Sequence, residues 1–232
     1  MNKVLSTRYD KKGRKQTVYQ PWFVERQRNI KFKRVMAFGN TFNKINKYVK
    51  NIISNDSKNI DIKERLICII IRLMILCNFR IGSHRYTREN GTYGLTTLQW
   101  KHIKFNKSSV FISFVGKKGV INEANVTDKD VINALRKLHK YAQDKCVFYY
   151  TRCITAKDVN EYIAQFDAKC TCKDIRTWRA NALFVKYFNE LSEEKNEKKR
   201  QSLAIKKVAT DLHNTPNVCI KSYICPALLL IA

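Results

Sequence analysis

Residues 211–226 read DLHNTPNVCIKSYICP, and the interpretation of the whole chain depends on them. Thr215 followed by Pro216 is typical of a helix start, because the hydroxyl accepts a free backbone N–H and proline lacks the hydrogen that would go unpaired there. The short helix ends close to Pro226, which tends to end or distort a helix. Tyr223 is therefore expected at the end of a short helical element. Taken alone, it is interpreted as a packing tyrosine beside a surface turn.

The composition is that of a folded and strongly basic protein. The chain has 232 residues and is 44% hydrophobic, enough to bury a core as one large domain or as one domain with an arm. Its 45 lysines and arginines exceed its 19 aspartates and glutamates, which gives a formal net charge of +26. This excess favours nucleic acid as the partner, with salt-sensitive binding. An anionic membrane is the competing partner, but no basic amphipathic helix stands out to bind one.

Cysteine spacing and hydropathy bear on the location of the protein. The eight cysteines form no Cys-x-x-Cys pair and no zinc-finger spacing, and residues 1–20 are too polar for a cleavable signal peptide. We therefore expect reduced thiols in an intracellular protein. The longest apolar run, residues 66–79, is too short to span a bilayer and contains Arg72. It predicts a buried helix and no membrane association.

The pattern along the chain predicts an α+β fold, mostly helical, with a small antiparallel hairpin or three-stranded sheet. Residues 1–20 are expected to form a basic, weakly structured arm in which residues 17–19 are able to make one strand. Alternating runs around the Gly116–Gly119 turn predict a hairpin with Lys117 and Lys118 at its tip. The strands are expected at 102–105, 110–115 and 120–121. Helices are expected at 22–53 (with a break near Gly39 left open), 62–79, 127–142, 155–166, 173–185 and after a charged connector at 192–201.

Three basic residues occur where a rigid element would present them to an anion. Arg80 follows an apolar helix that ends abruptly in Arg-Ile-Gly, before a loop rich in Arg, Tyr, Asn and Gly. Lys117 is expected at the hairpin tip. Arg176 lies off the apolar stripe in the first turn of its helix, where a cation is mildly disfavoured unless it shares an anion with the free N–H groups. Each also has an ordinary explanation as a helix-terminal, turn or solvated charge, so the residues alone leave both interpretations open.

Five separated motifs resemble those of one family. They are Arg80-Ile81-Gly82, the run YTRENGTYGLTTL from Tyr86 to Leu98, Val115-Gly116-Lys117, Lys173–Trp178, and Asn214-Thr215-Pro216 with Lys221-Ser222-Tyr223. In this order the chain resembles a type IB DNA topoisomerase of the small poxvirus and bacterial kind, from about Gly13 onward. The resemblance implies a fold like that of tyrosine recombinases and topoisomerases IB. It implies residues 21–232 as the catalytic domain, with a C-terminal truncation left open, and residues 1–20 as a remnant of, or linker from, an N-terminal β domain.

The resemblance also implies roles for single residues. Tyr223 would be the nucleophile, supported by Arg80, Lys117, Arg176 and Asn214. Counting back from Thr-Pro selects Asn214, and His213, one residue earlier, is the alternative. The residues expected to contact DNA are Arg85, Tyr86, Arg88, Tyr93, Lys118, Lys173, Arg179 and Lys221. The implied partner is double-stranded DNA, bound by a monomer without cofactor or metal, wherever that DNA lies: a viral factory or virion, a nucleus, or a bacterial cytoplasm.

These residue types can cleave a phosphodiester without a metal ion. A phenol with a pKa of about 10 is a poor nucleophile at neutral pH, so its attack on phosphorus needs help with both charge and proton. Two arginines can bind the non-bridging oxygens in place of a divalent ion, and Lys117 can protonate the departing 5′ oxygen. The 3′-phosphotyrosyl product keeps the energy of the ester, so rejoining needs no ATP. The sequence accordingly has no Gly-x-x-x-x-Gly-Lys-Ser/Thr loop.

Two other functions remain open. A tyrosine recombinase shares the two arginines, the lysine and the tyrosine, but usually has His-x-x-Arg where this chain has Lys173-x-x-Arg176, which favours the topoisomerase. The other is a DNA-binding relative without activity, because the chain lacks most of the family's N-terminal β domain and ends soon after Tyr223. Relaxation of supercoiled DNA, strand exchange, and binding without cleavage distinguish the three.

Overall fold

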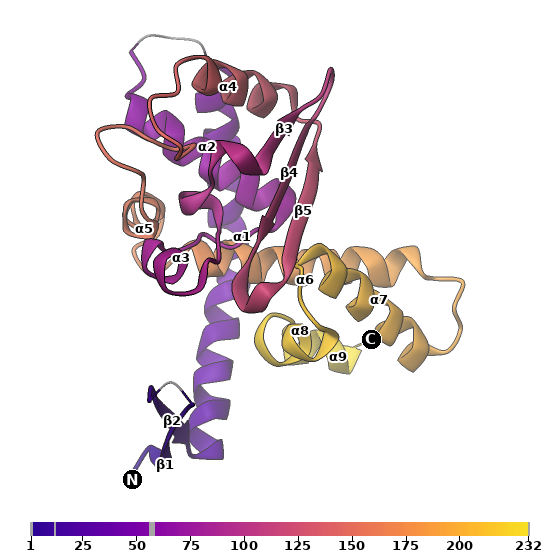
Figure 1. Ribbon diagram of the computed structural model, residues 1–232. Helices are drawn as coiled ribbons and strands as arrows, with labels where there is room; N and C mark the ends of the chain where they lie inside the picture. The colour runs from indigo at the N-terminus through magenta and orange to yellow at the C-terminus, as the bar shows by residue number, and fades with distance from the viewer. Residues whose placement is uncertain (1, 12, 56–58, 232) are drawn as a thin grey trace.

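The computed structural model describes residues 2–11, 13–55 and 59–231 (Figure 1). The fold is mostly helical with two small antiparallel sheets, which confirms the predicted α+β class. The strands are β1 Val4–Tyr9, β2 Lys15–Tyr19, β3 Ile103–Phe105, β4 Val110–Val115 and β5 Ile121–Val126. The helices are α1 Pro21–Ser54, α2 Ile62–Cys77, α3 His84–Asn90, α4 Lys129–Lys140, α5 Ala156–Ala164, α6 Cys172–Glu190, α7 Glu197–Asp211, α8 Pro216–Ser222 and α9 Pro226–Ile231. Short 3₁₀ turns occupy Leu95–Thr97, Trp100–His102 and Lys117–Gly119.

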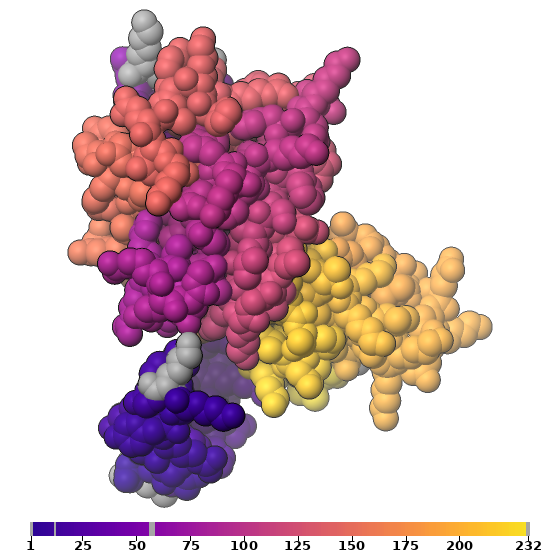
Figure 2. All heavy atoms as spheres, viewed as in Figure 1, coloured from indigo at the N-terminus to yellow at the C-terminus, as the bar shows by residue number. Residues whose placement is uncertain are grey.

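The N-terminal arm is a hairpin. The strand expected at 17–19 is confirmed as part of β2, but the expectation that the rest of the arm is weakly structured is wrong, because residues 4–9 form a second strand. β1 and β2 pair antiparallel, from Val4 opposite Tyr19 to Tyr9 opposite Lys15. The turn is closed by Asp10, whose carboxylate accepts hydrogen bonds from the backbone N–H and the Nε of Arg14, at 3.0 and 2.7 Å. The hairpin stands off the main body (Figure 2).

The long helix α1 carries this hairpin at one end and enters the core at the other (Figure 1). The break considered near Gly39 is absent, because α1 runs without interruption from Pro21 to Ser54. A Cβ at position 39 would lie 2.5 Å from the Cη2 atom of Trp178 on α6. The glycine therefore allows two helices to pack closely and does not break one.

The helix α2 is almost completely buried, as its apolar run predicts. Its one buried cation, Arg72, is paired: the guanidinium donates to Asp128 at 2.6 and 3.1 Å and to Asn46 at 2.9 Å. Such pairing is what makes a buried arginine tolerable. No helix in the described ranges combines the length and the apolar character needed to cross a bilayer.

The central sheet has the order β3-β4-β5, and the β4–β5 connection is the predicted hairpin. The backbone N–H of Gly116 donates to the carbonyl of Val120 at 2.7 Å, and Lys118 takes the left-handed conformation with φ 64°. Lys117 and Lys118 thus lie at an exposed tip, as predicted. The last strand is longer than expected, since the apolar pair at 120–121 is only its beginning.

Two stretches predicted as irregular contain helix. The loop after Arg80 includes α3, which ends at Gly91 with φ 62°. The charged connector at 192–201 is shorter than expected, because α7 begins at Glu197 behind Asn196, whose side chain accepts the N–H of Lys199 at 3.0 Å. Charged residues on one exposed helix face give no apolar periodicity, so the sequence pattern missed α3 and placed the start of α7, whose helix it did predict, several residues too late.

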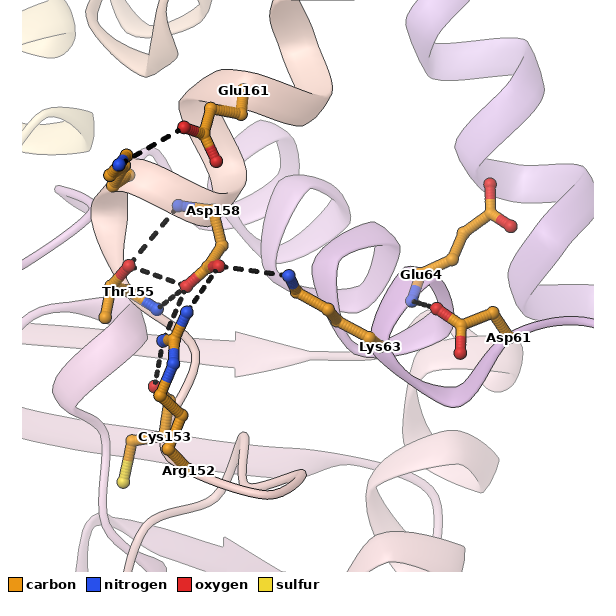
Figure 3. Close-up of polar contacts among 9 residues, drawn as sticks. Asp61, Lys63, Glu64, Arg152, Cys153, Thr155, Asp158 and Glu161 are labelled. Carbon is orange, nitrogen blue, oxygen red and sulfur yellow. Dashed lines mark hydrogen bonds and ion pairs between the residues drawn. The ribbon is translucent and has the colours of Figure 1, made fainter.

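A buried carboxylate fastens α5 to α2 (Figure 3). Asp158 accepts two hydrogen bonds from Arg152, at 2.8 and 2.9 Å, and one from the hydroxyl of Thr155 at 2.6 Å, and it pairs with Lys63 of α2 at 3.2 Å. The bonds from Arg152 are the main reason that the pKa of Asp158 lies far below its usual range. This network ties the start of α5 to the first turn of α2.

The hydrophobic core has two parts that meet along α6. The larger part joins α1, α2, the central sheet, α4, α5 and the first turns of α6. The smaller part joins the rest of α6 to α7 and α8 and includes Tyr223. Since α6 belongs to both, side chains near its start lie at the boundary between the two parts.

Candidate active site

A cavity of about 740 Å³ lies at the boundary between the two parts of the core. Its walls come from the segment between α2 and α3, the β4–β5 tip, the start of α6, the segment between α7 and α8, and the end of α8. The structure brings together here every residue predicted for catalysis, namely Arg80, Lys117, Arg176, His213, Asn214 and Tyr223. These residues are far apart in sequence, so the fold itself assembles them.

The helix α8 presents Tyr223 to this cavity. The helix begins at Pro216 and Thr215 accepts the N–H of Val218 at 3.4 Å, which confirms the predicted helix start. Tyr223 follows the last helical residue, and its own N–H bonds the carbonyl of Cys219 at 2.9 Å. Only 9% of the residue is exposed. The helix α8 ends at Ser222, four residues before Pro226, which instead starts α9.

The charges around Tyr223 favour its ionised form. Burial alone would raise the pKa of the phenol, but Arg176, Arg80 and Lys173 outweigh it, and the pKa lies below its ordinary value. The guanidinium of Arg176 is 5.3 Å from the centre of the tyrosine ring. A lowered pKa is the property that a tyrosine nucleophile needs.

Arg176 is the most deeply buried cation of the site, with 3% of the residue exposed. It occurs in the second turn of α6, since the helix starts at Cys172 and not at Lys173 as expected. One Nη donates to the carbonyl of Leu212. The Nε and the other Nη are buried and have no hydrogen-bond partner among the described residues. Because burial mainly, and Arg80 in addition, lower the pKa of this group, a bound anion would relieve an unfavourable arrangement.

Asn214 and His213 both line the cavity but make different contacts. The Oδ1 of Asn214 accepts from an Nη of Arg80 at 2.6 Å, while its Nδ2 is buried without a partner in the described chain. His213 has a left-handed backbone with φ 47°, and its ring lies 5.3 Å from that of Phe79. Burial, then the charge of Arg176, lower the pKa of His213, which keeps the imidazole neutral near pH 7. The helix start at Pro216 is the one that the choice of Asn214 requires.

The lining of the cavity is strongly cationic. Its basic side chains are Arg80, Lys117, Lys118, Lys173 and Arg176, and no carboxylate lines it among the described residues. Lys117 is exposed at the hairpin tip and also lines the cavity. The described residues contain no cluster of His, Cys, Asp and Glu side chains suited to a metal ion. The free donors of Arg176 and Asn214 are groups that bind an anion.

The predicted DNA contacts divide into three groups. Lys118 and Lys173 line the cavity, whereas Arg85, Tyr86, Arg88 and Lys221 are exposed outside it. Tyr93 is packed, with its ring centre 4.4 Å from that of His102. Arg179 is half-buried and its Nε donates to Asn78 at 3.4 Å. The last two are therefore tied to other residues of the fold.

Two residues that hold the main chain at Tyr223 were not predicted. The Nδ2 of Asn181 on α6 donates to the carbonyl of Tyr223 at 2.9 Å, and its Oδ1 accepts the N–H of Cys225 at 2.7 Å. The Nζ of Lys31 on α1 donates to the carbonyl of Ser222 at 2.8 Å. An asparagine inside an apolar helix has poor helix propensity, and this was the available signal for Asn181. For Lys31 the sequence offers none.

Comparisons with known proteins place the chain in a family. The family model described as "Eukaryotic DNA topoisomerase I, catalytic core" matches residues 20–223. DNA topoisomerase 1B of Acanthamoeba polyphaga mimivirus is 27% identical over 231 residues, which cover 93% of this chain and 68% of the relative. DNA topoisomerase 1B of Vaccinia virus (strain Copenhagen) is 28% identical over 227 residues, 95% of this chain and 69% of the relative.

A solved structure supports the fold alone. The XerH site-specific recombinase bound to its difH substrate, in a pre-cleavage complex, superposes with a TM-score of 0.50 at 13% identity. The match covers 83% of this chain and 52% of the recombinase, so the chain spans about half the length of that structure. The family model, by contrast, extends over most of the chain, from the start of α1 to Tyr223. The chain therefore belongs to the type IB DNA topoisomerases, the family of the eukaryotic DNA topoisomerase I catalytic core.

Proposed function

We propose that the chain relaxes supercoiled double-stranded DNA by cutting and rejoining one strand through a bond between Tyr223 and the 3′ phosphate. One observation carries the proposal. A buried tyrosine with a lowered pKa shares a cavity with Arg176, a buried arginine that has two unused donor groups. This is a nucleophile beside a site for an anion.

In this proposal the scissile phosphate binds between Arg176 and Arg80. The Nε and free Nη of Arg176 donate to its non-bridging oxygens, as arginine does to phosphate. Asn214 holds Arg80 through Oδ1, and its unpaired Nδ2 is free to donate to the same phosphate. These donors stabilise the extra negative charge of the pentacoordinate transition state. His213 is the alternative donor, because its neutral ring keeps one N–H.

The bond changes balance without a redox partner. The phenol of Tyr223 gives its proton to a water molecule and its Oη forms a bond to phosphorus, while the bond from phosphorus to the 5′ oxygen breaks. Lys117 protonates the departing 5′ oxygen and becomes a neutral amine. After strand rotation the 5′ hydroxyl attacks the phosphotyrosine and Lys117 takes its proton back, while Tyr223 leaves as a phenolate that regains a proton from water.

The groups that this reaction needs are side chains of one chain. The arginines supply the positive charge that a divalent ion would supply, and the phosphotyrosyl bond keeps the energy for rejoining. We therefore propose activity without metal or ATP, by a monomer, wherever its DNA lies. Residues 2–20 and the exposed basic side chains of α3 and α8 would bind the flanking duplex.

A tyrosine recombinase is the second candidate, supported by the fold likeness to XerH. Both reactions use the same covalent step, so they differ only in the steps after strand cleavage. Lys173, which lines the cavity, stands where recombinases usually have a histidine. This residue favours the topoisomerase.

The test measures relaxation of supercoiled plasmid in EDTA without ATP, together with the protein–DNA adduct trapped by denaturant. The wild-type chain should relax the plasmid and form the adduct, and Tyr223→Phe should do neither. Tyr141→Phe is the matched control, because Tyr141 is 72% exposed and is not among the residues that line the cavity. Salt-sensitive binding without adduct would refute cleavage and support an inactive DNA-binding relative. Exchange of strands between two specific sites would support the recombinase.

A further inference from the structure

One side chain of the N-terminal helix reaches the main chain beside Tyr223. Lys31, in the half of α1 nearer the hairpin, donates from Nζ to the carbonyl of Ser222 at 2.8 Å, across a sequence separation of 191 residues. Ser222 is the last residue of α8 and directly precedes Tyr223. A carbonyl at a helix end has no partner within its helix, so a cation is well suited to it.

The surroundings of Lys31 do not explain it as an ordinary surface lysine. The side chain is half-buried, and burial, followed by Lys173 of α6 and Arg28 of α1, lowers the pKa of its ammonium to about 8. Asp174 and the Cys225 thiol act in the opposite direction. Asp174 is already engaged by Arg34 at 2.7 Å. A cation placed among cations costs free energy, and the contacts that offset this cost are the Ser222 carbonyl and the face of the Phe32 ring, at 4.0 Å.

We infer that Lys31 is a positioning residue that fixes the turn carrying Tyr223 in line for attack, an inference that rests on the proposed function. It acts through the Ser222 carbonyl, while Asn181 holds the next carbonyl, that of Tyr223, from α6. Two consecutive carbonyls are thus held by two different helices. The phenol itself makes no hydrogen bond to Lys31 in the described structure, so the effect is on the main chain.

This role predicts a particular kinetic signature. Without the Lys31 bond the turn samples misaligned conformations, and the cleavage rate falls with the fraction of aligned molecules. In the covalent adduct the tyrosine is held by its bond to phosphorus, so the rejoining rate does not change. The equilibrium fraction of adduct therefore falls by the same factor as the cleavage rate. A residue that contacts the transition state would slow both directions equally, and a residue that only binds DNA would change affinity.

The experiment compares Lys31→Met with Lys33→Met on supercoiled plasmid. Methionine keeps an unbranched apolar stem but removes the ammonium, and Lys33 is an exposed lysine on the same helix, two residues away. Cleavage is followed by denaturant trapping with excess protein, and rejoining by the decay of the adduct after high salt blocks new binding. Affinity is measured in the Tyr223→Phe background, where no cleavage occurs.

For Lys31→Met we expect cleavage and the equilibrium adduct to fall about tenfold, the size expected for one charged hydrogen bond. Rejoining and affinity should stay within about twofold, as should all four quantities for Lys33→Met. Lys31→Arg should restore most of the cleavage rate. The advantage of wild type over Lys31→Met should shrink as the pH rises through about 8, where Lys31 loses its proton, and the advantage of Lys31→Arg should not.

Several results would overturn the inference while leaving the proposed function intact. In each of them the wild-type protein forms the adduct. Lys31→Met would then cleave at the wild-type rate, or slow cleavage and rejoining by the same factor, or lose only affinity for DNA. If a lowered melting temperature shows that Lys31→Met folds poorly, the cleavage rates of wild type and Lys31→Arg are compared as a function of pH instead. A wild-type rate that does not fall relative to that of Lys31→Arg as the pH rises through about 8 would overturn the inference. Absence of adduct in the wild type would instead refute the proposed function itself.

Discussion

Replacing Asn181 by alanine should both destabilise the protein and disable Tyr223. The side chain is 3% exposed and bridges α6 to the turn after α8, with bonds of 2.9 Å to the Tyr223 carbonyl and 2.7 Å from the Cys225 N–H. Its third bond, 2.7 Å to the Thr177 carbonyl, lies within α6. Alanine removes the two long-range bonds and leaves their main-chain partners buried and unpaired.

The magnitude is set by those two groups. Each buried group left without a partner costs about 1–3 kcal/mol, so the two together cost about 4 kcal/mol. For a chain of this length about 1 kcal/mol corresponds to 2–4 °C, so the melting temperature should fall by on the order of 10 °C. Adduct formation, measured well below the new melting temperature, should fall more than about tenfold, because the main chain at Tyr223 is no longer fixed.

The assay is thermal unfolding by circular dichroism, paired with denaturant trapping of the adduct at low temperature. Asn189→Ala is the control, because Asn189 is exposed on the same helix and its loss should cost less than about 0.5 kcal/mol. If Asn181→Ala melts within about 2 °C of wild type, the two bonds do not stabilise the turn as described. A normal adduct in the destabilised variant would separate stability from positioning and refute the second half of the argument.

Three further predictions concern the site and the helix crossing. Arg176→Gln should lower adduct formation at least about 100-fold, as loss of a preorganised donor does, while the melting temperature holds or rises because a desolvated charge is removed. Ultraviolet titration should find one phenol that ionises below the ordinary tyrosine range, and this phenol should be absent in Tyr223→Phe. Because the pKa of Tyr223 is lowered by folding, the ionised phenol stabilises the folded state at alkaline pH, and this stabilisation is lost as the pH falls through the folded pKa. Gly39→Ala should destabilise by about 1–3 kcal/mol in thermal unfolding, although alanine is the better helix former, because its Cβ would lie 2.5 Å from Trp178; an unchanged melting temperature would contradict the close packing.

Local patterns in the sequence were sufficient to predict most of the helices and the hairpin tip. The apolar spacing of α1 and α2 and the cap at Thr215 each depend on residues a few positions apart, and the structure confirms them. The catalytic candidates came from motifs, and the fold gathers them around one cavity. Their roles stay predictions until the adduct is tested.

The sequence could not predict features whose cause is a distant segment. Gly39 looked like a break because glycine weakens helices, but the reason for it is the ring of Trp178 on another helix. Lys31 and Asn181 donate hydrogen bonds to main-chain carbonyls. Every residue has such a carbonyl, so no sequence pattern identifies the ones that will be bonded. The arm hairpin was missed because its strands are mostly exposed and show no clear alternation.

The uninterrupted helix α1 also acts as a lever. At about 1.5 Å per residue, its start at Pro21 lies roughly 27 Å from the crossing at Gly39, and Lys31 lies roughly 12 Å from it. A small tilt about that crossing would therefore move the hairpin about twice as far as it moves Lys31. A displacement of about 2 Å at the hairpin would move the backbone at Lys31 by about 1 Å, which, if directed along the bond and not absorbed by the side chain, would stretch the 2.8 Å bond to Ser222 beyond hydrogen-bond range. Through α1, the position of the N-terminal hairpin is thus linked geometrically to a bond that lies next to Tyr223.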